Sequence, residues 1–154
     1  MFEIDLSLHS CMRKTLKIKQ PSFKHKTVML IDDNEMDNFI NQKIIEANFF
    51  SDKIYTNTNG LSALEFLNNL LVNKETLNQM LPEIIFVDLN MPLINGFQFI
   101  ESFYKMPKEL TQVCKIVILT SSLSAEDRDI AKTFKQKITF LNKPLTQESL
   151  SSIS

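Results

Sequence analysis

The sequence predicts an α/β protein built on a five-stranded parallel sheet, doubly wound so that helices cover both faces. Two observations carry this prediction. Short, continuous apolar runs recur along the chain, which is typical of strands buried on both faces of a parallel sheet. The segments between them hold apolar residues at helical spacing, and right-handed crossovers then place helices on the two sides.

Five segments are predicted as strands. Four are apolar runs rich in Ile, Leu, Val and Phe, and the weak one holds only Ile54 and Tyr55. They are residues 27–31, 54–55, 84–87, 116–119 and 138–141. A sheet of this kind binds ligands outside the carboxyl ends of its strands, so the residues that follow each strand are the candidates for function.

The first three helices are predicted from apolar spacing. One runs from about Phe39 to Phe49, and its apolar residues are expected on the buried side. A second begins at Gly60, and a third begins near Phe97. Residues 73–82 are interpreted as an extension of the second helix.

Two later helices are predicted from their first residues. Ser124 is expected to be an N-cap, with Asp127 three residues on in place of the Glu or Gln that a capping box prefers. A short last helix is expected to begin near Gln147.

Charge is distributed unevenly along the chain. The net charge is −1, but residues 1–26 hold six Lys or Arg against two acids, and the remainder holds eleven against sixteen. An acidic body argues against nucleic-acid binding. We therefore divide the chain into a basic, flexible N-terminal extension over residues 1–25 and one domain over residues 26–154. The only histidines, His9 and His25, are placed in the extension, so no phosphohistidine is expected in the domain.

The sequence also limits the expected location. No apolar run approaches the roughly 20 residues of a membrane helix, and the N-terminus lacks the apolar stretch of a signal peptide. Cys11 and Cys114 are too far apart to form a metal-binding motif. A cytoplasmic protein with no membrane contact is expected.

Polar residues that could act together in one reaction follow four of the strands. They are Asp32 and Asp33 after the first, Asp88 after the third, Thr120 after the fourth and Lys143 after the fifth. Each alone has an ordinary interpretation, as a helix cap or a surface lysine. Together at one sheet edge they fit phosphoryl transfer to a carboxylate. Clustered carboxylates repel one another, and a hard cation such as Mg²⁺ relieves that repulsion.

These residues stand in motifs that resemble the receiver domain of two-component response regulators. The motifs are residues 30–34, residues 87–92 with Gly96, residues 118–121 and residues 140–144. The resemblance runs from about Lys26 to the C-terminus. It implies the flavodoxin-like strand order 2-1-3-4-5 and a role in signal transduction, as a phosphorylated regulator or a phosphorelay intermediate.

The resemblance also implies a role for each residue. Asp88 would accept a phosphoryl group from a sensor histidine kinase or a phosphotransfer protein. Asp33 and Asp88 would bind Mg²⁺ directly, together with the backbone carbonyl of Asn90. Asp32 would act through a metal-bound water, and Lys143 would pair with the phosphoryl group.

Two further residues are implied in the response to phosphorylation. Thr120 would move toward the phosphoryl group, and the ring of Phe140 would turn into the vacated space, as a shift between two packings. Phe140 has a plainer interpretation as a core aromatic, and that alternative stays open.

The expected output is the binding of an unknown protein target. Ten residues follow Pro144, too few for a DNA-binding domain, so a stand-alone receiver is expected. By resemblance it would signal through the surface of the fourth family helix, the fifth strand and the last helix. It would not be an enzyme beyond its own phosphorylation and dephosphorylation.

Two alternatives stay open. One is a receiver-like interaction module that is not phosphorylated. The other is a phosphatase of the haloacid-dehalogenase type, whose nucleophile would be Asp32, although Asn34 stands where that family has a second acid.

Overall fold

The computed structural model describes residues 19–153 and contains the predicted sheet. Five strands pair in the order β2-β1-β3-β4-β5, and every neighbouring pair is parallel, which confirms the fold class and the strand order. The strands are β1 (His25–Ile31), β2 (Ser51–Asn57), β3 (Ile84–Asp88), β4 (Lys115–Thr120) and β5 (Thr139–Asn142).

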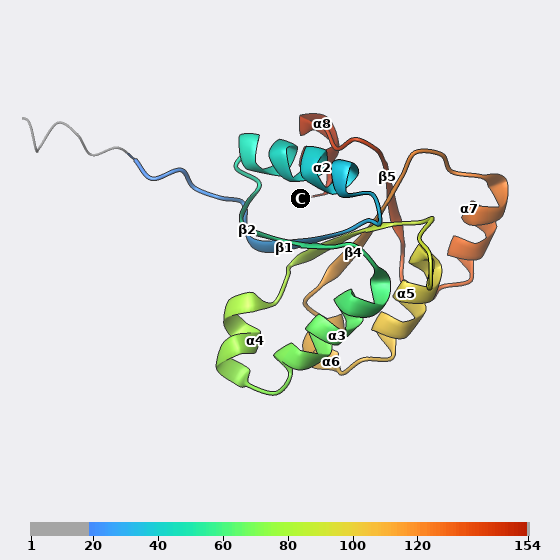
Figure 1. The fold of residues 1–154 in the computed structure, drawn as a ribbon, viewed down its shortest axis with the longest axis horizontal. Helices are drawn as coiled ribbons and strands as arrows, with labels where there is room; N and C mark the ends of the chain where they lie inside the picture. The colour runs from blue at the N-terminus through green and yellow to red at the C-terminus, as the bar shows by residue number, and fades with distance from the viewer. Residues whose placement is uncertain (1–18, 154) are drawn as a thin grey trace, which may run out of the picture.

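Helices cover both faces of the sheet (Figure 1). α2 and α8 lie on one face, α3 and α5 lie on the other, and α7 lies beyond α5 at the β5 edge. The helices are α2 (Glu35–Ala47), α3 (Gly60–Leu70), α4 (Lys74–Met80), α5 (Gly96–Tyr104), α6 (Lys108–Thr111), α7 (Ala125–Lys132) and α8 (Gln147–Ser152).

Each face of the sheet has its own apolar core. Val28 and Leu30 of β1 belong to the cluster that includes residues of α2 and α8. Met29 and Ile31 belong to the cluster on the side of α3 and α5. Because successive strand side chains point to opposite faces, a strand covered on both sides must be apolar throughout, and this made β1 recognisable from sequence.

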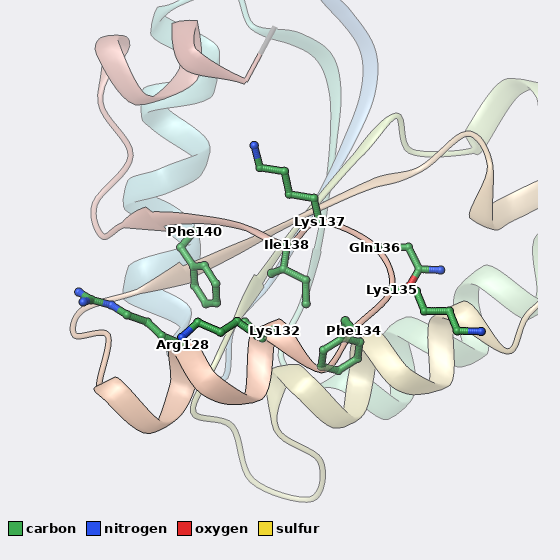
Figure 2. A pocket seen from close by; sticks show the side chains of 9 residues that line it. Arg128, Lys132, Phe134, Lys135, Gln136, Lys137, Ile138 and Phe140 are labelled. Atoms are coloured by element: carbon green, nitrogen blue, oxygen red, sulfur yellow. The ribbon is translucent and has the colours of Figure 1, made fainter.

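α7 joins the larger of these clusters through the segment that follows it. Phe134 lies just after α7 and points toward α5 (Figure 2). Its ring stacks on that of Phe97, with centroids 6.0 Å apart. The predicted start of α7 is confirmed, because Ser124 and Asp127 form a capping box through two bonds of 3.0 Å.

α2 buries only part of the predicted apolar side. Ile45 is buried, but Phe39 and Phe49 are 56% and 51% exposed, and Asn38 and Asn41 are buried instead. Asn38 Nδ2 donates to the carbonyls of Asp32 and Asn57, at 2.9 and 3.2 Å. The asparagines are buried because they satisfy backbone groups of neighbouring loops, which apolar side chains cannot do.

β2 is longer than predicted, with seven residues instead of two. It is an edge strand, and it pairs with β1 from Ser51 to Asn57. Exposed polar residues such as Asp52 and Lys53 interrupt its apolar pattern. Its length therefore comes from backbone pairing with β1 and not from its side chains.

The interpretation of residues 73–82 as an extension of the second helix is wrong. α3 ends at Leu70, and Asn73 caps a separate helix, α4, by accepting from the Glu75 N–H at 2.8 Å. The four-residue helix α6 had no sequence signal, because it is too short to show a period.

The placement of His25 in the extension is also wrong. It is the first residue of β1, and its Nδ1 lies 2.7 Å from Oε2 of Glu83. It lies at the amino end of the parallel strands, opposite the end at which Asp88 lies. Most of the predicted extension, with His9, falls in residues 1–18, outside the described residues. Between residues 19 and 153, no helix has the length and apolarity to span a membrane.

Candidate functional site

Three carboxylates meet at the carboxyl edge of the sheet. Asp32 and Asp33 follow β1, and Asp88 is the last residue of the neighbouring strand β3. One oxygen from each lies within 4.8 Å of the others. Asp32 and Asp88 are 4% and 6% exposed, whereas Asp33 faces solvent. The site is thus a mostly buried acidic cluster with one open side.

The turn after β3 fixes the backbone of Asp88. The N–H of Gly96, at the start of α5, donates to the carbonyl of Leu89 at 2.9 Å. A Cβ atom on Gly96 would lie 2.7 Å from the backbone oxygen of Asp88, a separation that real side chains do not show. Only glycine therefore lets α5 begin this close to the end of β3.

Asn34, and not an aspartate, caps α2. Its side chain accepts from the N–H groups of Met36 and Asp37. Asp32 accepts from the Asn34 N–H with Oδ1, at 2.9 Å, and keeps Oδ2 for Lys143. The helix-cap interpretation of Asp32 and Asp33 is therefore excluded, and both remain available to the cluster.

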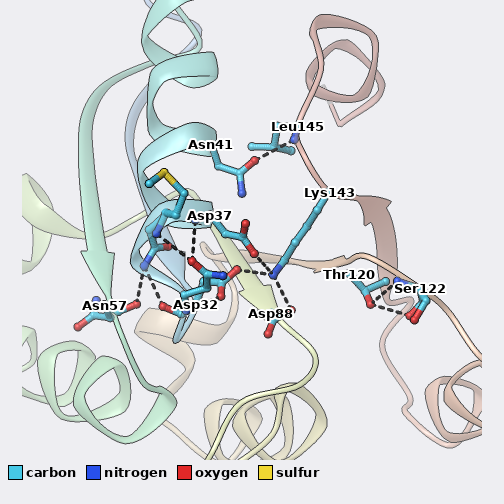
Figure 3. Close-up of polar contacts among 12 residues, drawn as sticks. Asp32, Asp37, Asn41, Asn57, Asp88, Thr120, Ser122, Lys143 and Leu145 are labelled. Carbon is cyan, nitrogen blue, oxygen red and sulfur yellow. Dashed lines mark hydrogen bonds and ion pairs between the residues drawn. The ribbon is translucent and has the colours of Figure 1, made fainter.

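Lys143 connects three carboxylates (Figure 3). Its Nζ lies 2.5 Å from Oδ2 of Asp32, 3.0 Å from Oδ1 of Asp88 and 3.0 Å from Oδ2 of Asp37. The lysine side chain is only 12% exposed. It is therefore not an ordinary surface lysine, because its charge is desolvated and held by the cluster.

The cluster shifts the pKa of two of its members. Burial raises the pKa of Asp88, and the charges of Asp32 and Asp33 raise it further, while Lys143 opposes the shift. Burial lowers the pKa of Lys143, but its bonds to the carboxylates outweigh burial and raise the pKa overall. The carboxylate charge is thus only partly compensated by the lysine.

Two contacts hold the loop that carries Lys143. Its backbone N–H donates to the carbonyl of Thr120 at 3.0 Å, and Oδ1 of Asn41 accepts from the Leu145 N–H at 2.8 Å. The peptide bond between Lys143 and Pro144 is cis. A cavity of about 250 Å³ opens beside Lys143 and is lined also by Asp37, Asn41 and Ser121.

Thr120 ends β4 beside the cluster, but its hydroxyl is engaged elsewhere. Its Oγ1 donates to the carbonyl of Ser122 at 2.7 Å and accepts from the Ser122 N–H at 3.3 Å. A hydroxyl has one hydrogen, so any bond from Thr120 to a group on Asp88 requires this contact to break.

Phe140 packs outside the acidic cluster, whereas Asn90 follows Asp88 by two residues. Phe140 of β5 lies opposite Ile118 of β4, packs against the core on the side of α5, and lines a surface cavity. It is therefore both a core contact and a surface residue. Asn90 is exposed in the loop after β3.

Asp37 was missed by sequence reasoning. It lies within the first turn of α2, where acidic residues are common because they favour the helix N-terminus. Asp33 precedes the N-cap Asn34 and lies outside α2, so helical spacing does not connect the two aspartates, and no local pattern connects Asp37 with Lys143, which is 106 residues away.

The sequence profile of the response regulator receiver domain matches residues 28–153. Among solved structures, a two-component response regulator from Cytophaga hutchinsonii is 30% identical, with a TM-score of 0.73, and the match covers 86% of this chain and 95% of that chain. No match was found among curated protein sequences.

Two further structures show the same fold at lower identity. A response regulator receiver protein from Dyadobacter fermentans is 22% identical, with a TM-score of 0.69 and coverage of 83% of this chain and 94% of that chain. A phosphorylated cyanobacterial phytochrome response regulator is 22% identical, with a TM-score of 0.63 and coverage of 84% and 88%.

Proposed function

The chain belongs to the response regulator receiver domain family, and on this basis we propose that it signals by accepting a phosphoryl group on Asp88. One observation carries the assignment to Asp88. This carboxylate ends the central strand β3, is buried, and contacts Lys143 beside two further carboxylates. One of the similar structures is of a phosphorylated response regulator, which supports the proposal.

In the proposed reaction, a carboxylate oxygen of Asp88 attacks the phosphorus of a phosphohistidine on a sensor histidine kinase or a phosphotransfer protein. The O–P bond forms as the P–N bond breaks, and the imidazole leaves with a proton from solvent. Lys143 donates a hydrogen bond to a phosphoryl oxygen. Attack of water on phosphorus later releases inorganic phosphate and restores the carboxylate.

The acidic cluster fits a hard divalent cation such as Mg²⁺. Its donors are carboxylate oxygens, and one lysine compensates only part of their charge. Asp33 and Asp88 would hold the ion with the carbonyl of Asn90, and Asp32 would hold it through a water. The bound ion would neutralise charge on the phosphoryl oxygens.

We propose that Thr120 and Phe140 report phosphorylation to the surface. Thr120 would exchange the carbonyl of Ser122 for a phosphoryl oxygen, and the ring of Phe140 would turn inward. The surface of α7, β5 and α8, which holds a groove of about 780 Å³, would then change its affinity for a protein target. The only covalent chemistry proposed is on Asp88 itself, with no turnover of another substrate. The cytoplasmic location stays a prediction.

The test is phosphorylation by a small donor. With Mg²⁺ and acetyl phosphate, intact-protein mass spectrometry is expected to show one phosphoryl adduct, which Asp88→Asn abolishes. Asp52→Asn is the matched control, because Asp52 is an exposed aspartate at the far end of β2. Beryllofluoride is expected to shift the amide resonances around Thr120 and Phe140 in the wild type only.

Two outcomes would contradict the proposal. If saturating Mg²⁺ and acetyl phosphate leave the wild type unmodified, the chain is instead an interaction module that is not phosphorylated. Steady turnover of p-nitrophenyl phosphate would favour the haloacid-dehalogenase alternative, which the family match does not support.

A further inference from the structure

Asn38 is a buried side chain next to the acidic cluster that the proposed reaction does not use. It lies near the start of α2 and is 5% exposed. Its Nδ2 donates to the carbonyl of Asp32 at 2.9 Å and to the carbonyl of Asn57 at 3.2 Å. Its Oδ1 is buried and, within residues 19–153, has no hydrogen-bond partner. The side chain therefore serves as a donor to two backbone groups, at the points where β1 and β2 end.

The contact with Asp32 closes a ring of three hydrogen bonds at the start of α2. Oδ1 of Asp32 accepts from the N–H of Asn34 at 2.9 Å. The carbonyl of Asn34 accepts from the N–H of Asn38 at 3.1 Å. The side chain of Asn38 then donates back to the carbonyl of Asp32. Residues 32–38 are thus held as one unit, which fixes the first turn of α2 against the end of β1.

The strand β2 holds this unit from the other side. The N–H of Asp32 donates to the carbonyl of Asn57 at 3.1 Å, which continues the pairing of β1 with β2 by one residue. Asn38 donates to the same carbonyl of Asn57. Both backbone polar groups of Asp32 therefore have a partner, and Asn38 is the partner of its C=O group.

The carbonyl that Asn38 holds belongs to the peptide unit between Asp32 and Asp33. Because a peptide unit is planar, the direction of its C=O also sets the direction of its N–H and of the next Cα atom. The Asp33 side chain is exposed and, among the residues that the structure describes, makes no hydrogen bond or ion pair. Its place in the cluster, with one oxygen within 4.8 Å of those of Asp32 and Asp88, is therefore set by its backbone.

We propose that Asn38 is a positioning residue for the divalent cation site of the proposed function, on which this inference rests. By holding the peptide unit between Asp32 and Asp33, it keeps both carboxylates directed toward Asp88, where their oxygens can share one ion. An amide suits this task, since one NH₂ group can donate to two carbonyls. Asn38 does not contact the ion or the phosphoryl group and acts only through the backbone of the two aspartates.

The first test needs no ion. In the metal-free protein, Asn38→Ala is expected to shift the carbonyl carbon resonance of Asp32 and the amide nitrogen resonance of Asp33, because both atoms belong to the peptide unit that loses its hydrogen bond. Ile45→Val is the matched control, since Ile45 is fully buried on the same helix, two turns further on. Both substitutions are expected to lower stability, but only Asn38→Ala is expected to shift these two resonances.

The second test is a titration with Mg²⁺ alone, without a phosphoryl donor. The amide resonances of residues 32–34 and 88–90 report the Kd. Asn38→Ala is expected to raise the Kd for Mg²⁺ about tenfold, as is typical when a residue that orients metal ligands is lost. Ile45→Val is expected to leave the Kd unchanged, whereas Asp88→Asn is expected to weaken binding strongly and so to identify the site.

A second variant allows for failure of Asn38→Ala to fold. Asn38→Ser keeps one donor on a shorter side chain, and its Kd is expected to lie between those of the wild type and Asn38→Ala. The proposal is overturned if neither variant folds, because Asn38 is then needed for the fold itself. It is also overturned if the variants bind Mg²⁺ as tightly as the wild type, if Ile45→Val weakens binding equally, or if the resonances of Asp32 and Asp33 do not shift.

The results also separate this inference from the proposed function. A wild type that binds no Mg²⁺ would overturn both the role of Asn38 and the proposed cation site. Phosphorylation of Asp88 together with a Kd that does not depend on Asn38 would overturn the role of Asn38 alone. Binding of Mg²⁺ that depends on Asn38, without phosphorylation by acetyl phosphate, would support the role of Asn38 and contradict the proposed phosphorylation.

Discussion

At the scale of single residues, Lys143 binds one more carboxylate than the proposed phosphoryl transfer uses, namely that of Asp37. Its three N–H groups match three carboxylates, of Asp32, Asp37 and Asp88. In the proposed reaction, a phosphoryl group on Asp88 would also require one of these donors. Asp37, whose side chain is 35% exposed, would therefore compete with the phosphoryl group for the lysine.

Asp37→Asn is expected to accelerate phosphorylation by acetyl phosphate about two- to fivefold, the range that a partly exposed charge pair supports. The substitution keeps the shape of the side chain and removes its charge, which frees Lys143 and reduces repulsion of the anionic donor. The rate is measured by mass spectrometry over time. Glu35→Gln removes a neighbouring charge that has no contact with Lys143, and an equal acceleration in both variants would contradict the competition.

Asn41 has a structural role that its polar side chain did not indicate in the sequence. It is 2% exposed, and its Oδ1 accepts from the backbone N–H of Leu145. Asn41→Leu is expected to lower the free energy of unfolding by about 1–3 kcal/mol, because it leaves that buried N–H without a partner. Urea denaturation measures the loss. Asn69→Leu, at an exposed position of α3, is the control and is expected to have little effect.

At the scale of elements, the loop between β3 and α5 contains a strained residue. Leu93 has a φ of 70°, in the left-handed region that favours glycine and asparagine, and it is 74% exposed. Its side chain therefore gains little packing to offset the strain.

Leu93→Asn is expected to raise the free energy of unfolding by up to about 1 kcal/mol, because asparagine tolerates this conformation. Urea denaturation again provides the measurement. Leu61→Asn, at an exposed leucine in the helical backbone of α3, is expected to give no gain. A gain at both positions would attribute the effect to lower surface hydrophobicity and not to strain.

Among the elements, the positions of the buried strands could be predicted from the sequence, but the side of α2 that is buried could not. β1, β3 and β4 are covered on both sides, so burial alone dictates their composition. α2 places Asn38 and Asn41 inward, because backbone groups of two loops need partners there. That requirement comes from contacts distant in sequence, which a local periodicity does not contain.

At the scale of the whole molecule, the core on the α5 side encloses a thiol. Cys114 is 5% exposed, and burial raises its pKa to about 12 from a usual value of 9.0. As the pH rises above about 9, the unfolded thiol loses its proton while the folded thiol keeps it. The unfolded state is then favoured, and stability falls progressively until the pH reaches the folded pKa.

Two proteins are compared, and both carry Cys11→Ser; the first keeps Cys114 and the second has Cys114→Ala. The free energy of unfolding of the first is expected to exceed that of the second by an amount that shrinks above pH 9. The slope is at most about 1.4 kcal/mol per pH unit. Urea denaturation at several pH values provides the test. Tyr104 is present in both proteins, so the part of its raised pKa that comes from burial cancels in the comparison. A constant advantage between neutral and alkaline pH would show that the thiol ionises equally in both states.

By itself, the sequence determined the sheet, its alternation with helices, and the chemistry at the strand ends. Buried strands must be apolar, and each of the polar residues Asp32, Asp88 and Lys143 comes at or just after the end of one. Only the tertiary structure decided which charges meet. It placed Asp37 beside Lys143 and directed the hydroxyl of Thr120 toward Ser122. The physical reason is that burial constrains composition residue by residue, whereas an ion pair depends on distances between segments that fold together from separate parts of the chain.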